Sequence, residues 1–357
     1  MPKFHPLTIS EIRPETDDCV SIAFAVPESL IDAYTYQPGQ YLTLRAEVNG
    51  EDLRRSYSLC SSPVEGEWRV AIKRIPDGKF SSYAHTQLQA GDTLDVMTPT
   101  GNFVLDTDPT AAKHYVAFAA GSGITPILSM LKTVLAEEPQ SRFTLFYGNR
   151  RAGEVIFREA IEGLKNVHLG RLAVHYVLSR QHPGSELFYG RIDGARCTRF
   201  AERLFDPLDV AGYYLCGPEP MIRSVTSALQ DLGVDKANIH FELFTSPLGA
   251  LGGETRVRAK PQRKILAEVE IIQDAKAFTF GLDSQGETLL DAALKGGADL
   301  PFACKGGVCS TCKARVLKGE VEMELNYALE PDEVAAGYVL TCQAHPVTAQ
   351  VTISFDE

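Results

Sequence analysis

Residues 304–312 read CKGGVCSTC and bring three cysteines into nine positions. The chain has 357 residues and only eight cysteines, so this cluster is dense. A further cysteine, Cys342, follows the cluster in the sequence, and the full spacing is Cys304-x4-Cys309-x2-Cys312-x29-Cys342. These four thiols are candidate ligands of a metal centre, and one tight loop would supply three of them.

The spacing resembles the C-x4-C-x2-C…C pattern of plant-type 2Fe–2S centres. Two irons bridged by two sulfides need four thiolates, and a loop can supply three of them from one side. Gly306 and Gly307 have no Cβ, so backbone amides of this loop can turn toward the sulfurs. We therefore predict a 2Fe–2S cluster whose ligands are Cys304, Cys309, Cys312 and Cys342.

Two other readings of the cysteines remain open at this point. A zinc site with four cysteine ligands usually takes two close pairs, whereas this chain has one close triplet and one distant partner. A thioredoxin-like redox pair would use Cys309-x2-Cys312, but no predicted strand leads directly into that pair.

The composition is that of a soluble globular protein, with 44% hydrophobic and 23% charged residues. The N-terminus has no apolar signal-peptide core, and residues 115–136, the most apolar stretch, are interrupted by glycine, proline and lysine. Four cysteines are scattered (Cys19, Cys60, Cys197 and Cys216), which does not form a disulfide framework. We expect a cytoplasmic protein with no membrane partner.

The net charge of −11 argues against a nucleic-acid partner, because no basic stripe accompanies it. The charge is distributed unevenly. Residues 265–357 hold 15 acidic and 6 basic side chains, whereas residues 1–264 hold 31 acidic and 29 basic ones. The C-terminal quarter is therefore predicted to be a separate, acidic unit.

Hydrophobic patterning divides the chain into three folded segments and a linker. Short alternating runs separated by turn residues predict an antiparallel β-barrel over 1–107. Apolar strands alternate with helical stretches over 108–244, as in a parallel α/β domain. Residues 245–264 are rich in glycine, proline and basic residues, which predicts a linker. A hairpin, a short helix and a closing strand are expected over 265–357.

The motif GSGITP at 121–126 follows an apolar strand and opens a helical stretch. Gly121 and Gly123 allow close approach of a ligand to the backbone, and Pro126 suits the first turn of a helix. A helix N-terminus behind such a loop suits the diphosphate of a dinucleotide. A plain structural turn is the alternative.

The following strands lack the acidic residue that binds the ribose 2′-hydroxyl in NAD sites. The second strand ends in a segment that contains Arg150, and the third ends with Ser179 and Arg180. Arginine and serine suit a 2′-phosphate, so we predict NADPH rather than NADH. Solvated surface charges are the alternative reading of these arginines.

A second constellation lies in the predicted barrel. Arg55, Tyr57 and Ser58 end one strand, and Lys73 is followed by a turn that contains Ser81 and Ser82. An arginine for a diphosphate, a tyrosine to cover a flavin ring and hydroxyls for its oxygens would fit a flavin. Ordinary decoration of β-strands fits the same residues.

Taken together, the motifs resemble the ferredoxin–NADP reductase superfamily. Arg55-x-Tyr57-Ser58, GSGITP at 121–126 and Cys216-Gly217-Pro218 occur in the family's order, and a plant-type ferredoxin follows them. The resemblance implies a multidomain α/β plus β fold: a flavin-binding antiparallel barrel, a parallel α/β nucleotide-binding domain and a C-terminal β-grasp ferredoxin-like domain. Residues 304–346 are especially similar to the reductases of multicomponent phenylacetyl-CoA epoxidases.

The resemblance also implies a role for each motif residue. FAD would be held by Arg55, Tyr57, Ser58, Lys73, Ser81 and Ser82. NADPH would be held by Gly121, Gly123, Thr125, Arg150, Ser179 and Arg180. Cys216 would lie beside the nicotinamide, with an ordinary buried thiol as the alternative, and Phe244 would cover the outer face of the flavin.

The implied activity is that of an NADPH-dependent oxidoreductase. A flavin accepts a hydride from NADPH and passes electrons singly to the 2Fe–2S cluster. The implied partner is the oxygenase component of a multicomponent monooxygenase, with phenylacetyl-CoA epoxidase first. A Rieske-type oxygenase such as steroid 9α-hydroxylase is one alternative, and a non-catalytic four-cysteine metal-binding module is another.

Overall fold

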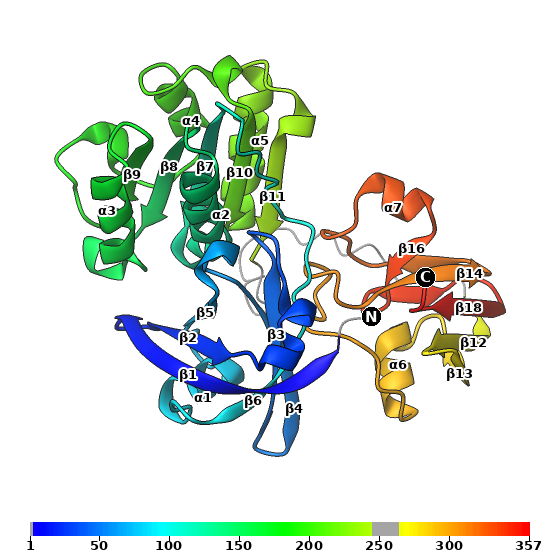
Figure 1. Cartoon of the computed structure of the whole chain (residues 1–357). Helices are drawn as coiled ribbons and strands as arrows, with labels where there is room; N and C mark the ends of the chain where they lie inside the picture. The colour runs from blue at the N-terminus through cyan, green and yellow to red at the C-terminus, as the bar shows by residue number, and fades with distance from the viewer. Residues whose placement is uncertain (1–2, 245–263) are drawn as a thin grey trace. The chain divides into compact units, whose positions relative to one another are not determined.

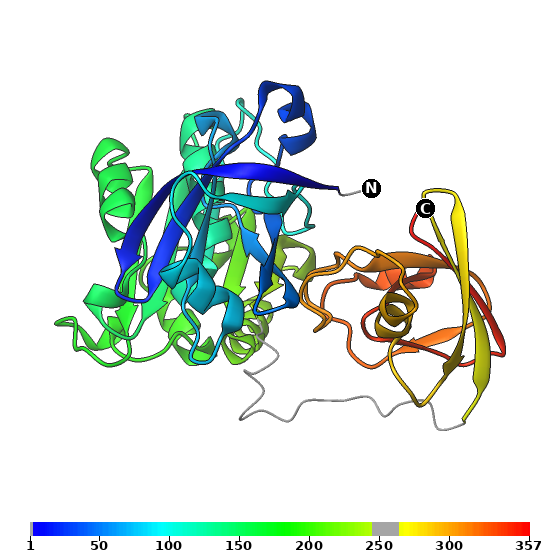
Figure 2. The ribbon, with the colours of Figure 1, turned by 90° about the horizontal axis from the view of Figure 1, so that it is seen from below.

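The computed structural model describes residues 3–244 and 264–357 (Figures 1 and 2). It divides into two compact units, one of residues 4–244 and another that contains residues 264–357. The predicted linker 245–264 lies, apart from Lys264, outside the described residues. No described helix is long and apolar enough to cross a membrane.

The N-terminal part of the first unit is an antiparallel barrel (blue to cyan in Figure 1). Its strands are β1 (Phe4–Thr16), β2 (Cys19–Ala25), β3 (Tyr41–Val48), β4 (Glu51–Ser58), β5 (Trp68–Lys73) and β6 (Thr93–Met97). Their order is β4-β3-β6-β1-β2-β5, and Cys60 N donates to Arg69 O at 2.8 Å to bring β4 beside β5. Helix α1 (Lys79–Thr86) follows β5 and buries Phe80 and Ala84 in the barrel core. The predicted antiparallel fold is confirmed.

A five-stranded parallel sheet forms the rest of this unit (green in Figure 1). Its strands are β7 (His114–Ala120), β8 (Arg142–Asn149), β9 (Leu172–Leu178), β10 (Gly212–Gly217) and β11 (Ile239–Leu243). The helices are α2 (Ile124–Glu137), α3 (Arg158–Val167), α4 (Gly194–Ala201) and α5 (Glu219–Asp231). All five strands are parallel, and their order in the sheet is β11-β10-β7-β8-β9. The chain adds β8 and β9 on one side of β7 and then β10 and β11 on the other side, so the strand order changes direction at β7. Ligands of such sheets bind at the carboxyl ends of the strands near this point.

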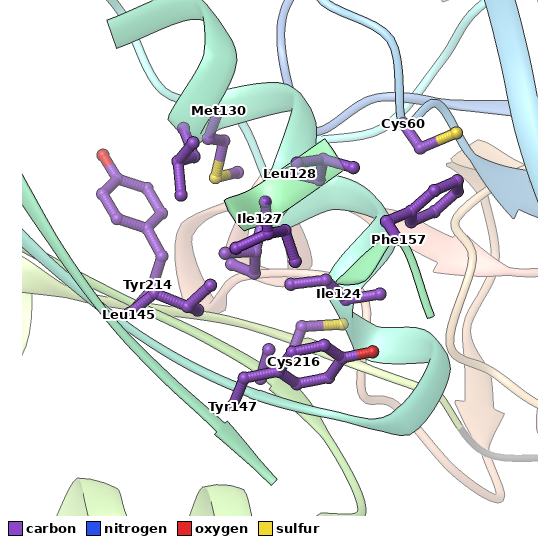
Figure 3. Close-up of a cluster of buried hydrophobic side chains, with 14 of the residues drawn as sticks. Cys60, Ile124, Ile127, Leu128, Met130, Leu145, Tyr147, Phe157, Tyr214 and Cys216 are labelled. Carbon is purple, nitrogen blue, oxygen red and sulfur yellow. The ribbon is translucent and has the colours of Figure 1, made fainter. Parts of the chain in front are cut away.

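The barrel and the parallel sheet share one hydrophobic core. Cys60 and Phe103 of the barrel segment pack in the same cluster as Ile127 of helix α2, and Figure 3 shows Cys60 among the side chains of this core. Two buried polar contacts reinforce the junction. The Ser129 hydroxyl donates to Ser61 O at 2.6 Å, and the Ser62 and Thr133 hydroxyls are 2.8 Å apart. Because buried polar groups are satisfied across the junction, the barrel and the sheet are held in one arrangement.

The second unit is a mixed sheet with a short helix (yellow to red in Figure 1). Its strands are β12 (Leu266–Gln273), β13 (Lys276–Asp283), β14 (Lys313–Lys318), β15 (Val321–Met323), β16 (Tyr338–Leu340), β17 (Ala344–Pro346) and β18 (Gln350–Ser354). The main sheet has the order β13-β12-β18-β14-β16, and β12 and β18 are parallel. The predicted hairpin and closing strand are confirmed, as is the ferredoxin-like fold.

Helix α6 (Leu289–Lys295) covers the core of this second unit. Thr288 is its N-cap, with the side-chain oxygen accepting from Asp291 N at 3.2 Å, and Gly296 is its C-cap. Leu289, Leu290 and Ala293 are fully buried. Helix α7 (Pro331–Ala335) is a single turn that starts with a proline at its first position.

Two details do not follow from the local sequence pattern. Helix α3 begins only at Arg158 because Phe157 adopts a left-handed φ of 59°. Strand β1 was not predicted. It is 13 residues long, contains two prolines and has two register shifts against β2, which obscure the alternation of apolar and polar residues.

Candidate functional site

A cavity of about 620 Å³ opens at the carboxyl ends of the parallel strands. Every strand of the sheet contributes to it: Gly121 follows β7, Arg150 follows β8, Ser179 follows β9, Pro218 follows β10 and Phe244 follows β11. Lys73, at the end of barrel strand β5, also lines it. The sheet thus gathers segments that lie far apart in the sequence.

The glycine loop after β7 forms one wall of this cavity. Gly121 has φ +55°, a left-handed conformation that favours glycine, and its carbonyl accepts a hydrogen bond from the buried Tyr147 hydroxyl at 3.0 Å. Gly121 and Ser122 line the cavity. Gly123 lies behind them, where a Cβ would be 2.2 Å from Cys216 O. The first glycine therefore shapes the loop, and the second permits close packing of α2 against β10.

Thr125 supports this loop from inside the protein. It is 1% exposed, and its hydroxyl donates to Ser122 O at 3.0 Å. The Thr125 side chain therefore stabilises the loop from behind. The residues of the loop that line the cavity are Gly121 and Ser122.

Cationic and hydroxyl side chains line part of the cavity. Arg150 and Ser179 line it, as does Arg191, which the sequence analysis did not identify. Gly190 N donates to Leu178 O at 2.9 Å, and this bond brings the segment of Arg191 beside the end of β9. Because this is a long-range contact, no local pattern marks Arg191.

Of the two predicted arginines, Arg150 lines the cavity and Arg180 does not. Arg150 forms ion pairs with Glu154 and, at 3.8 Å, with Asp18. Arg180 is exposed and does not line the cavity, and its backbone N donates to Arg150 O at 2.8 Å. The geometry therefore offers Arg150, Ser179 and Arg191 as direct contacts to an anionic ligand.

The end of barrel strand β4 carries the predicted flavin residues. Arg55 is exposed, and its guanidinium donates to Arg54 O at 2.7 Å. Tyr57 is half-buried and packs on Phe80, with ring centroids 5.8 Å apart. The Ser58 hydroxyl donates to the Glu242 carboxylate at 3.1 Å, so this strand end meets the end of β11.

The turn before α1 holds the other predicted flavin residues. Ser81 is buried, its oxygen accepts from Ile75 N at 3.2 Å, and its hydroxyl is 3.2 Å from Gly78 O. Ser82 N also donates to Gly78 O, at 2.9 Å. The helix has no side-chain cap, so backbone N–H groups of its first turn remain as donors for an anion. Together with Arg55 and Tyr57, this donor set fits a flavin diphosphate.

Glu242 is a candidate site residue that the sequence analysis missed. It lies on β11 opposite Cys216 of β10. Burial raises its pKa to about 8, although the hydrogen bond from Ser58 works in the opposite direction. No local motif marks this glutamate, because its environment is created by two other strands.

Cys216 is fully buried, and Figure 3 shows it within the shared core. Burial raises the pKa of its thiol well above the ordinary value, and the neighbouring Glu242 adds to the effect. The thiol does not line the cavity, whereas the next residue, Gly217, does.

Phe244 follows the last strand of the sheet and faces the cavity. It is half-buried, lines the cavity and packs on the shared core. An aromatic ring at this place could cover a ligand bound between the barrel and the sheet.

In the second unit, the four candidate ligand cysteines form two pairs. Cys309 lowers the pKa of the Cys304 thiol, and Cys312 lowers the pKa of the Cys342 thiol. Within the ranges described, no group of three or more His, Cys, Asp or Glu side chains could hold one metal ion. Two pairs of thiols are the arrangement that a two-iron centre requires, since each iron takes two of the four thiolates.

The loop 304–312 turns backbone N–H groups toward its sulfurs. Gly306 N donates to Cys304 Sγ at 3.3 Å. The hydrogen bond from Cys309 and those from Gly306 and Val308 lower the pKa of Cys304 to about 6, against the effect of burial. Positive φ angles at Lys305 and Gly307 produce this turn. The donor set therefore fits an anionic iron–sulfur cluster.

Three family models match the chain in order. The oxidoreductase FAD-binding domain matches residues 6–105, the oxidoreductase NAD-binding domain residues 118–227 and the 2Fe-2S iron-sulfur cluster binding domain residues 272–347. Over its full length the chain is 44% identical to a component of the 1,2-phenylacetyl-CoA epoxidase of Escherichia coli, covering 99% of that protein. The chain belongs to the family of flavin- and iron–sulfur-dependent oxygenase reductases.

Further comparisons agree with this family. The chain is 35% identical to the ferredoxin reductase component of 3-ketosteroid-9-alpha-monooxygenase from Rhodococcus rhodochrous, over 98% of this chain and 96% of that one. The crystal structure of phthalate dioxygenase reductase has the same fold, with a TM-score of 0.58, 22% identity and coverage of 99% and 98%. A type IV self-sufficient cytochrome P450 monooxygenase aligns with a TM-score of 0.70 and 25% identity, and this chain spans 41% of it.

These comparisons decide between the 2Fe–2S reductase and the alternatives that the cysteine spacing left open. A member of this family is an oxidoreductase with FAD-, NAD- and 2Fe–2S-binding domains, so the non-catalytic metal module and the zinc site are set aside. The predicted fold, family and enzyme class are confirmed.

Proposed function

We propose that this chain is the reductase of a phenylacetyl-CoA epoxidase and transfers electrons from NADPH to its oxygenase component. The observation that carries the proposal is the 44% identity to the E. coli epoxidase component, which extends through all three domains. We also propose that the protein acts in the cytoplasm.

The flavin would be held at the end of β4 and at the N-terminus of α1. Arg55 and the backbone N–H groups of α1 would bind the diphosphate, and Tyr57 would stack against the ring. Ser58, Ser81 and Ser82 would contact the flavin, and Ser81 also holds the turn before α1. Lys73 would add a positive charge nearby. When bound, FAD supplies the means to accept two electrons from a nicotinamide and release them one at a time.

The dinucleotide would lie in the cavity at the sheet edge. Gly121, supported by Gly123 and Thr125, would cradle its diphosphate. Phe244, from the end of β11, would flank the nicotinamide and the flavin. Cys216 would lie beside the nicotinamide at the end of β10, behind the cavity-lining Gly217. The residues contribute by orienting the two rings and by excluding water, because hydride transfer requires close alignment but no general base.

NADPH is proposed as the preferred nucleotide. Arg150, Ser179 and Arg191 line the cavity, and Arg180 lies on the surface with its backbone bonded to that of Arg150. Guanidinium groups bind phosphate through two parallel hydrogen bonds, so they favour a ribose with a 2′-phosphate. Strand β9 is followed by Ser179 and Arg180 and not by an acidic residue, although Glu154 and Asp193 also line the cavity.

The 2Fe–2S cluster would be held by Cys304, Cys309, Cys312 and Cys342. The pairing of their thiols supports one iron for Cys304 and Cys309 and a second for Cys312 and Cys342. The charge of the C-terminal quarter, 15 acidic against 6 basic side chains, supports docking on a basic surface of the oxygenase.

The 35% identity to the steroid monooxygenase reductase favours a second candidate, a reductase of a Rieske-type oxygenase. Reconstitution decides between the two. The purified holoprotein should support turnover of a phenylacetyl-CoA epoxidase oxygenase at a rate at least about tenfold higher than that of a 3-ketosteroid 9α-hydroxylase oxygenase. The opposite order of rates would overturn the assignment of the acceptor.

A further inference from the structure

Gln343 follows the last candidate ligand, Cys342, and its side chain is buried beside the loop that carries the other three. It is 7% exposed. Its side-chain nitrogen donates to Lys305 O at 2.9 Å and to Cys342 O at 2.8 Å, and lies 3.7 Å from Cys342 Sγ. One amide group therefore contacts both the loop and the distant cysteine.

The orientation of this amide follows from its surroundings. Both near neighbours, Lys305 O and Cys342 O, are carbonyl oxygens, which only accept hydrogen bonds. The side-chain nitrogen must face them, because the flipped amide would place oxygen against oxygen. Its two hydrogens serve three acceptors, so at least one hydrogen is shared.

The backbone and the stem of Gln343 are also fixed. Gln343 N donates to Leu340 O at 2.9 Å, and Gln343 O accepts from Glu324 N at 2.8 Å. Its Cγ lies 3.3 Å from the position that a Cβ at Gly307 would occupy. A side chain at position 307 would therefore meet the stem of Gln343, and Gly307 has a φ of +73° that favours glycine.

We propose that Gln343 is a positioning residue that ties loop 304–312 to Cys342 and raises the reduction potential of the cluster. The inference rests on the proposed role of Cys342 as a ligand. Reduction adds one negative charge to the cluster, and the ligand sulfurs share it. A hydrogen bond to such a sulfur strengthens with its charge and stabilises the reduced state.

The substitution Gln343→Met tests this role, because methionine keeps an unbranched side chain of similar length and removes the donor. Gln350→Met is the matched control, since Gln350 lies exposed on β18 and its amide oxygen accepts from Lys318. In a dye-mediated redox titration of the holoprotein, Gln343→Met should shift the cluster equilibrium about tenfold toward the oxidised state, which is ~59 mV for one electron. An unchanged potential in a variant with full iron content would overturn the inference.

A second measurement uses the unaltered protein and does not depend on the stability of a variant. With ¹⁵N placed at glutamine side-chain amides, pulse EPR of the reduced cluster should show a weak ¹⁵N coupling, and Gln350→Met should retain it. Absence of any coupling would overturn the inference even if Gln343→Met cannot hold a cluster. A wild-type protein without the 2Fe–2S signal would instead contradict the proposed function.

Discussion

The Ser58 hydroxyl donates a hydrogen bond of 3.1 Å to the Glu242 carboxylate, joining the end of barrel strand β4 to the end of sheet strand β11. The two residues are 184 positions apart in the sequence. Glu242 lies opposite Cys216, whose neighbour Gly217 lines the nucleotide cavity. The pair therefore lies at the junction where the barrel meets the nucleotide-binding sheet.

The first prediction concerns Glu242 and pH. Burial raises its pKa from 4.5 to about 8, so between these values the unfolded state has lost a proton that the folded state retains. The free energy of unfolding should therefore fall as pH rises through this window. The variant Glu242→Gln has no carboxyl group at this position, so it should not show this fall. The free energy of unfolding of the variant minus that of wild type should therefore increase from pH 5 to pH 9, as measured by urea unfolding of the holoprotein.

Ser58→Ala provides a directional control for this prediction. The Ser58 hydrogen bond lowers the pKa of Glu242, so its removal should move the upper end of the window to higher pH. Glu202→Gln, at an exposed glutamate of the same unit, should keep the wild-type profile. Identical pH profiles for wild type and Glu242→Gln would contradict the assignment.

The second prediction concerns the close contact behind the glycine loop. A Cβ at Gly123 would lie 2.2 Å from Cys216 O, so Gly123→Ala must displace α2 or β10. We expect a loss of about 1–3 kcal/mol in stability and weaker NADPH binding. At Gly153 nothing lies within 4 Å, and Gly153→Ala should change stability by no more than about 0.5 kcal/mol. Equal effects in denaturant titrations would show that the contact is unimportant.

The third prediction concerns the choice of nucleotide. Arg150→Ala should raise the KM for NADPH about tenfold or more and the KM for NADH about twofold at most, because only NADPH carries the 2′-phosphate. Arg180→Ala should act in the same direction. Arg142→Ala is the control, since Arg142 pairs with Asp209 at the opposite end of β8. If both nucleotides respond alike to Arg150→Ala and Arg180→Ala, these arginines do not bind the phosphate.

Parts of this account could be predicted from sequence because they are encoded locally. The spacing of the four cysteines indicates a cluster, and alternating apolar runs mark strands such as β3 and β6. The glycine loop is marked by its position between a strand and a helix. In each case, the chemistry and the local backbone requirement lie within a few residues of one another.

Other parts depend on contacts between distant strands and left no local signal. Glu242 becomes notable only because β4 and β10 enclose it, and Arg191 only because its loop bonds to the end of β9. Gly123 is predicted from sequence to cradle a phosphate, and that role stays a prediction. The structure adds a close packing of Gly123 against Cys216, which no local pattern marks.

The fourth prediction concerns ionic strength. Because the C-terminal quarter is strongly acidic, electron transfer to the oxygenase should slow as salt increases. Reduction of a small uncharged acceptor by the same protein should change much less, since the flavin and nucleotide sites are not involved in docking. Equal salt sensitivity in stopped-flow measurements of both rates would contradict charge-steered docking.

Electrons from NADPH are proposed to pass through the flavin to a cluster held by four cysteines. An anaerobic NADPH titration of the holoprotein, followed by absorption and EPR, tests this transfer most directly. We predict flavin bleaching and a reduced 2Fe–2S signal in wild type and in Cys197→Ser, a buried cysteine outside the cluster loop. In Cys309→Ser we predict flavin bleaching without the cluster signal. A reduced-cluster signal in Cys309→Ser equal to that of wild type, or wild-type protein without iron and acid-labile sulfide, would contradict the account.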